Sequence, residues 1–360
     1  MDGFKNIDIK NFRGIEHLKI DDFSRVNVLV GHNNSGKSSV LEALMLQTGM
    51  SNPDLPQQLN TLRNVNLYSN FADIRYMFYG IDMQKMPEFT AEQFDTIKRH
   101  LKLSLAYTFD EKNQQDKHSN QSATSETKIF FNTLKMAFEI QTSSGVEEYS
   151  CSMITNQAGM ITGKYIAEGY LEKNSASFIS ANLAINNAVW DLAELIKRKQ
   201  KDVILGRLAL FDSRINAIEI INNNVFIGFE GINELLPMGM TGDGLRRYLS
   251  IVASTANQQN NIILIDEIDN GLHYTAYKKL WESIFMLAVS TNKQVFITTH
   301  SKETLMQLNE MLEEHPEYQE MFRMYTIEKT QLKGHKAYKY GYEGLKNACM
   351  NDVELRSIAL

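Results

Sequence analysis

The sequence is poor in cysteine and has no long apolar run, and both features exclude whole classes of protein. Its two cysteines, Cys151 and Cys349, lie far apart without paired spacing. A disulfide framework and a zinc site are therefore not expected, and a reducing cytoplasm fits. No segment approaches the roughly 18–20 apolar residues of a membrane span, and residues 1–6 contain no apolar signal core. We expect a cytoplasmic protein without membrane contact.

The chain also lacks an excess of positive charge. Its formal net charge is −6, so it is not a basic nucleic-acid coat as a whole, although a local basic groove is compatible with that value. Apolar residues make up 43% and charged residues 22% of the 360 residues, which argues against wholesale disorder. This length predicts one large domain or two closely associated lobes.

The segment at 31–39 carries the clearest chemical signal. It reads Gly-His-Asn-Asn-Ser-Gly-Lys-Ser-Ser and matches the P-loop pattern, between an apolar run and a helix-periodic stretch. Backbone N–H groups and the positive helix end should bind a polyphosphate, with Lys37 on the terminal phosphates and Ser38 on Mg²⁺. The sequence therefore predicts ATP and Mg²⁺ as ligands, with contacts from Gly31, Asn33, Asn34, Ser35, Gly36, Lys37, Ser38 and Ser39.

Two later apolar runs end in side chains suited to phosphate chemistry. One run leads into Asp266-Glu267 and the other into His300. Unbroken apolar strands separated by helical segments predict a parallel sheet covered on both faces, and ligands bind at the carboxyl ends of such strands. Asp266 is the expected partner of Ser38 on Mg²⁺. Glu267 is expected to orient or deprotonate the attacking water, while His300 and Lys37 act at the γ-phosphate.

A second glycine-rich loop precedes a helical stretch further along the chain. Gly242, Asp243 and Gly244 stand directly before the helix-periodic residues 245–252. A glycine loop at a helix N-terminus is an anion site, and one nucleotide does not need two such sites from one chain. We therefore expect a dimer in which each chain offers this loop to the ATP of the other. The alternative is a simple turn at the start of a helix.

Three segments together resemble a known family. They read Asn-Phe-Arg-Gly at 11–14, Gly-Asp-Gly-Leu-Arg-Arg at 242–247, and Asp-Glu-Ile-Asp-Asn-Gly-Leu-His at 266–273 with Thr-His-Ser at 299–301. The chain resembles ABC-type ATPase heads of the RecF/SMC/OLD class over residues 1–50 and 225–345. More narrowly, it resembles the stand-alone bacterial OLD-like AAA family ATPases without a Toprim domain. The 242–247 loop departs from the transporter signature Leu-Ser-Gly-Gly-Gln, which argues against a transporter subunit.

The resemblance implies a composite site in which two heads sandwich ATP between a P-loop and the partner's 242–247 loop. It also implies that residues 269–273 form a D-loop at that interface and that Arg13 lies near the nucleotide. Gln47 and Gln57 are both candidates for the Q-loop glutamine. The stretch after His300 is too short for a Toprim domain. The implied partners are therefore further copies of the chain and a separate effector, such as a Toprim-type nuclease in an anti-phage defence system.

The expected fold is an α/β P-loop NTPase of ABC-type head architecture, with a mixed or parallel sheet and an inserted β-rich and helical region. We divide the chain into a head part at 1–75, the insert at 76–224 and a second head part at 225–360.

Local patterns predict further elements. These are strands at 101–109, 129–131 and 136–140, a polar loop at 110–128, helices at 185–203 and 274–289, and a hairpin at 324–340. The basic run at 197–201 is a solvated helix end or a DNA contact, and the lysine–tyrosine alternation in the hairpin is a solvated strand face or a nucleic-acid surface.

Three functions are compatible with these motifs. The first is an ATP-hydrolysing head that dimerises and gates a partner or DNA. The second is a RecF-type DNA-binding repair ATPase that acts without a dedicated effector. The third is a scaffold that binds ATP structurally and barely turns it over.

Overall fold

A six-stranded sheet forms the centre of the molecule. The computed structural model describes residues 3–63, 71–106, 133–155, 161–180, 184–330, 334–351 and 353–354. The strand order is β16-β15-β3-β14-β13-β9, and all neighbours are parallel except β15 and β16. The bounds are β3 (Val26–Val30), β9 (Ala176–Ile179), β13 (Ile262–Ile265), β14 (Gln294–Thr298), β15 (Phe322–Thr330) and β16 (Gly334–Tyr340). The predicted α/β fold with a mixed, mainly parallel sheet is confirmed.

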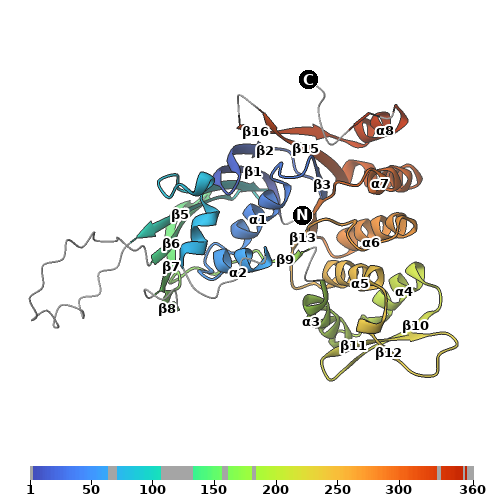
Figure 1. The fold of residues 1–360 in the computed structure, drawn as a ribbon. Helices are drawn as coiled ribbons and strands as arrows, with labels where there is room; N and C mark the ends of the chain where they lie inside the picture. The colour runs from blue at the N-terminus through green and yellow to red at the C-terminus, as the bar shows by residue number, and fades with distance from the viewer. Residues whose placement is uncertain are drawn as a thin grey trace, which may run out of the picture.

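Strands β3, β13 and β14 are buried at every position, which explains why they read as largely apolar runs. On β13, Ile263 and Ile265 belong to one hydrophobic cluster, whereas Ile262 and Leu264 belong to another. The first cluster includes the helices α5 (Asp243–Ala256), α6 (Tyr277–Ser290), α7 (Lys302–Glu314) and α8 (Tyr342–Met350). Figure 1 shows these four helices stacked along one side of the sheet.

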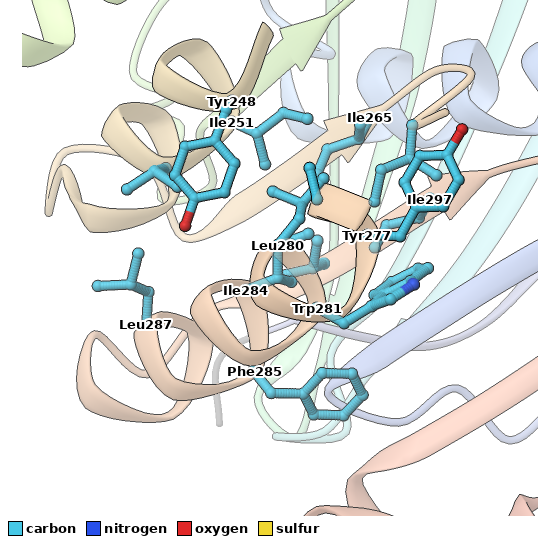
Figure 2. Packing of buried hydrophobic residues seen from close by; sticks show 14 of the residues in the cluster. Tyr248, Ile251, Ile265, Tyr277, Leu280, Trp281, Ile284, Phe285, Leu287 and Ile297 are labelled. Atoms are coloured by element: carbon cyan, nitrogen blue, oxygen red, sulfur yellow. The ribbon is translucent and has the colours of Figure 1, made fainter. Parts of the chain in front are cut away.

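Helix α6 is the expected crossover between β13 and β14, and its apolar face fills the centre of the first cluster. Figure 2 shows its side chains packed among Tyr248 and Ile251 of α5, Ile265 of β13 and Ile297 of β14. Trp281 of α6 is fully buried and its indole N–H donates to the Thr304 carbonyl at 3.0 Å. This packing fixes α5 against the strand that leads into the two acidic residues.

A second, antiparallel sheet and two helices cover the other face. The helices are α1 (Lys37–Thr48) and α2 (Leu55–Leu62). The sheet has seven strands in the order β2-β1-β4-β5-β6-β7-β8. Its bounds are β1 (Phe4–Phe12), β2 (Ile15–Ile20), β4 (Glu88–Gln93), β5 (Lys98–Ala106), β6 (Thr133–Thr142), β7 (Gly145–Thr155) and β8 (Ile161–Tyr165). Strands β1 and β2 form an antiparallel hairpin ahead of the P-loop strand β3.

The helix predicted at 185–203 is wrong in its extent. Helix α3 (Ala184–Lys197) ends inside the basic run, and α4 (Lys201–Phe211) begins at its last residue. The break occurs because Lys199 adopts a left-handed backbone with φ 60°, which no helix can continue through. After α4 comes a small sheet of β10 (Ile215–Ile221), β11 (Asn224–Phe229) and β12 (Leu236–Pro237).

The strand pairings cross the boundaries of the three-part division, which stays a prediction. Strand β9 of the proposed insert pairs with β13 of the core sheet, β4 pairs with β1, and the boundary at 224/225 falls within strand β11.

The predictions for 107–132 and for the hairpin tip at 331–333 lie outside the described residues. Short 3₁₀ helices occupy 71–77, 79–81, 238–240, 274–276 and 316–321. Within the described ranges, no helix is long and apolar enough to cross a membrane.

Candidate nucleotide site

Strand β3 delivers the P-loop, and two of its glycines are required by geometry. Gly31 has φ +146°, and a Cβ there would lie 2.4 Å from the Ile327 carbonyl oxygen of β15. Gly36, with φ +98°, is the N-cap residue directly before α1. Side chains at these positions would strain the backbone or displace β15, so the loop can turn this tightly only with glycine.

The N-terminus of α1 is open to an anion. Among the described residues no side chain caps it, and its first turn contains no acidic residue. The Ser35 hydroxyl is buried, and no partner for it is found among the described residues. A helix start with free N–H groups and a partial positive charge binds phosphate. The P-loop residues therefore fit the phosphates of ATP.

Lys37 lies within the same loop. Its Nζ donates to the carbonyl oxygens of Gly31 and His32, each at 2.8 Å. Burial lowers the pKa of Lys37, while the charges of Asp266 and Glu267 work against that lowering. A desolvated ammonium held by neutral carbonyls gains from an incoming phosphate, because the anion supplies the counter-charge that water no longer does.

Ser38 and Asp266 meet at the expected metal position. The Ser38 hydroxyl donates to Asp266 Oδ1 at 2.8 Å, and the Thr298 hydroxyl donates to the same oxygen at 2.6 Å. A hydroxyl and a carboxylate are hard oxygen ligands of the kind that Mg²⁺ prefers. The pair fits Mg²⁺. The hydrogen bond from Thr298 orients the carboxylate, as residues that contact a metal ligand commonly do.

Glu267 follows directly and has an unusual backbone. Its φ is +49°, a left-handed conformation that costs a non-glycine residue free energy. Its N–H donates to the Thr298 hydroxyl at 2.8 Å, and its side chain is half-buried at the same sheet edge. Sequence reasoning missed Thr298, although this polar residue at the end of an apolar run was a usable signal.

His300 follows β14, but half of its side chain is exposed. Its Nε2 lies 3.7 Å from Asp269 Oδ2, at an exposed fraction of 50%. Thr299 donates to the other oxygen of Asp269 at 2.6 Å, and Ser301 caps α7 by accepting from the Thr304 N–H at 3.2 Å. The structure thus joins His300 to the segment after Glu267.

The loop at 242–244 packs against a different segment, the one at 269–273. Asp243 is 75% exposed and pairs with Arg246. A Cβ at Gly244 would lie 3.1 Å from the Gly271 carbonyl oxygen, whereas one at Gly242 would meet no atom of the described residues within 4 Å. The loop therefore starts α5 with an open side and adjoins the predicted D-loop.

Arg13 sits in an ion-pair cluster behind the P-loop helix. Its Nε donates to Glu42 of α1, which also accepts from Arg63 at 2.5 Å. Arg63 in turn lies 3.4 Å from the Ser39 hydroxyl, so the cluster reaches the P-loop. Sequence reasoning missed Glu42 and Arg63, because a charged residue outside a motif gives no signal of its partners. Gln47 is fully buried and donates to the Phe89 carbonyl.

Comparisons with known proteins agree with this geometry. The sequence profile of a family described as "AAA ATPase domain" matches residues 4–157 and 160–305. An "ATP/GTP phosphatase" of Helicobacter pylori is 28% identical over 333 residues, which cover 86% of this chain and 88% of that protein. The "DNA replication and repair protein RecF" of Nitrosococcus oceani is 46% identical over 41 residues, 11% of each chain.

Solved structures support the fold alone. An SMC head bound to the C-terminal winged-helix domain of ScpA matches with a TM-score of 0.50 and 11% identity, covering 96% of this chain and 99% of that one. The Smc head of Pyrococcus furiosus with an extended coiled coil, bound to the C-terminal domain of ScpA, also matches with a TM-score of 0.50, at 9% identity, over 98% and 100% of the two chains. The architecture is thus that of an ABC-type, SMC-like head. The chain is an ATPase and belongs to the AAA ATPase domain family.

Proposed function

We propose that the chain is a cytoplasmic, Mg²⁺-dependent ATPase that closes into a dimer around ATP and thereby gates a separate effector. The observation that carries the chemistry is the 2.8 Å contact of Ser38 with Asp266, beside Lys37 and Glu267. In this proposal Ser38 and Asp266 hold Mg²⁺, which when bound supplies charge neutralisation on the phosphates. Lys37 contacts the terminal phosphates, and Glu267 orients the attacking water and accepts its proton. His300 contacts the γ-phosphate or that water.

The open side of the 242–244 loop supports a second chain as the missing half of the site. The Asp243 side chain is 75% exposed, and a Cβ at Gly242 would have no described atom within 4 Å. Two large apolar side chains stand near this loop and the adjoining 269–273 segment, Met240 at 79% and Tyr274 at 59% exposure. A helix start flanked by exposed apolar residues suits a phosphate and a protein surface together.

We place the effector function in anti-phage defence, because the motifs resemble those of stand-alone OLD-like ATPases. In this proposal ATP binding closes the dimer and hydrolysis opens it, and the effector responds to the closed state. The candidate effector is a Toprim-type nuclease encoded separately.

A RecF-type DNA-binding ATPase is the second candidate. The local similarity to RecF and the exposed Lys336 and Lys339 on β16 favour it. Lys339 pairs with Asp22 at 2.8 Å, however, so part of that positive charge is already neutralised.

Steady-state ATPase assays separate these functions. Glu267→Gln should lower kcat by about 100-fold or more, the usual contribution of a general base, and should accumulate an ATP-bound assembly in size-exclusion chromatography. Glu310→Gln, at an exposed position on α7, is the matched control and should turn over normally. ATPase stimulation by DNA that fades with salt would favour the RecF-type function. Wild-type turnover in Glu267→Gln would contradict the proposed mechanism.

A further inference from the structure

Arg247 of α5 makes an unusual set of contacts. It is only 3% exposed, and its guanidinium donates to three backbone carbonyls rather than to a carboxylate. The acceptors are Ser180 at 2.6 Å, Asp266 at 2.5 Å and Glu267 at 3.1 Å. These bonds join the helix that begins at the 242–244 loop to the ends of β9 and β13.

Two of these carbonyls flank the strained residue of the site. The bonds to Asp266 and Glu267 hold the peptide groups on either side of the left-handed Cα of Glu267. Thr298 of β14 holds the same segment by accepting from the Glu267 N–H at 2.8 Å. A left-handed glutamate persists only where its surroundings impose it. Arg247 and Thr298 provide that constraint from two different elements.

Arg247 also lies close to the open loop along its own helix. It is three residues after Gly244, a separation of roughly 4.5 Å along an α-helix at about 1.5 Å per residue. The start of α5 is therefore linked to the Glu267 peptide groups through less than one helical turn and the Arg247 side chain. Burial lowers the pKa of Arg247 to about 10, so the guanidinium is still charged at neutral pH and its bonds to the carbonyls are charge-assisted.

We propose that Arg247 is a positioning residue that holds the Glu267 backbone in its hydrolytic geometry and couples it to the 242–244 loop of the same chain. When this loop contacts the ATP of a second chain, it orders Glu267 in its own chain. ATP binding at one site of the dimer therefore promotes hydrolysis at the other site. This inference rests on the proposed function, because it assigns the hydrolytic role to Glu267.

Arg247→Lys tests the proposal, because lysine keeps the charge but cannot reach three carbonyls at once. We expect kcat to fall by roughly 10- to 100-fold, the range for a misplaced catalytic group, with KM for ATP changed by less than about threefold. The matched control is Arg25→Lys. Arg25 also donates to backbone carbonyls, those of Ala288 at 3.0 Å and Lys293 at 3.3 Å, at the other end of the sheet. This control should keep the wild-type kcat.

A double-mutant cycle with Glu267→Gln separates positioning from general destabilisation. If Arg247 acts through Glu267, single-turnover hydrolysis by the double variant equals that of Glu267→Gln alone. The proposal would be overturned if the double variant hydrolysed ATP more slowly than Glu267→Gln by the full factor seen in Arg247→Lys alone. A wild-type kcat in Arg247→Lys would also overturn it. So would a kcat loss in Arg25→Lys as large as that in Arg247→Lys. Wild-type turnover in Glu267→Gln would instead overturn the proposed function.

Discussion

Ser38 and Asp266 are 228 positions apart in the sequence, yet the hydroxyl of one donates to the carboxylate of the other at 2.8 Å. The contact exists because β14 lies between β3 and β13, so the P-loop and the acidic pair leave the same edge of a parallel sheet. Thr298, at the end of β14, donates to the same carboxylate at 2.6 Å. Residues that follow or end three neighbouring strands thus meet at one carboxylate, which is the position proposed for Mg²⁺.

Ser38→Ala should weaken the response of the ATPase to Mg²⁺. Removing one oxygen ligand should raise the Mg²⁺ concentration for half-maximal turnover by about tenfold or more, the equivalent of a lost charge-assisted contact of about 1.5 kcal/mol. The measurement is turnover at fixed ATP over a Mg²⁺ titration. Ser290→Ala, at the end of α6, is the control. An unchanged titration in Ser38→Ala would show that the hydroxyl does not ligate the metal.

Gly242→Ala should spare the fold and block ATP-dependent association. The backbone there is extended, with φ −66°, and a Cβ would meet no atom of the described residues within 4 Å, so the substitution should lower the free energy of unfolding by less than about 1 kcal/mol. In the proposed dimer the added methyl group would meet the nucleotide of the second chain. Analytical ultracentrifugation with ATP, in the Glu267→Gln background, measures the association. Gly239→Ala, whose Cβ also meets no described atom within 4 Å, should associate normally. Equal association of both variants would argue against the composite site.

Glu42→Gln should destabilise the fold, because Arg13 would remain buried without its counter-charge. The side chains of Glu42 and Arg13 are 4% and 7% exposed, whereas that of Arg63 is 39% exposed and contributes less. We expect the free energy of unfolding to fall by about 2–4 kcal/mol, measured by urea denaturation at neutral pH. Glu310→Gln should change it by less than about 0.5 kcal/mol. An equal value for both variants would mean that the cluster does not stabilise the protein.

The sequence predicts best the strands whose residues are all buried. Strands β3, β13 and β14 are buried along their whole length, so most of their residues are apolar and the strands are easy to recognise. Strand β9 is four residues long, contains Ser177 and lies at the sheet edge, so its pattern is too short to identify. The end of α3 was missed because Lys199, not a glycine, takes the left-handed backbone.

The residues of the candidate site also fall into those that the sequence identifies and those that it does not. Residues that belong to a local motif, such as Lys37, Ser38 and Asp266, were identified because spacing along the chain encodes their chemistry. Thr298 and Arg247 were missed as supporting residues, because their roles are hydrogen bonds between elements that become neighbours only in the folded sheet. A sequence pattern carries no record of such pairs.

Lys293 should make stability depend on pH above about 8. Lys293 is 1% exposed, and its Nζ donates to the carbonyl oxygens of Ser254 and Asn257. Burial lowers its pKa to about 8, although the negative charge of Asp191 acts to raise that pKa. In the unfolded chain the lysine pKa is about 10.4. Between these values the unfolded state binds more protons, so the contribution of Lys293 to stability rises with pH.

Lys293→Met isolates this effect from that of other groups. Burial raises the pKa of Cys151 to about 12, so the unfolded thiol loses its proton first and stability falls with pH over an overlapping range. The quantity to compare is therefore the free energy of unfolding of wild type minus that of the variant. We expect this difference to shift in favour of wild type by about 2 kcal/mol between pH 7.5 and 9.5, measured by urea denaturation with a reductant present. A difference that stays constant over that range would show that Lys293 keeps its ordinary pKa in the folded protein.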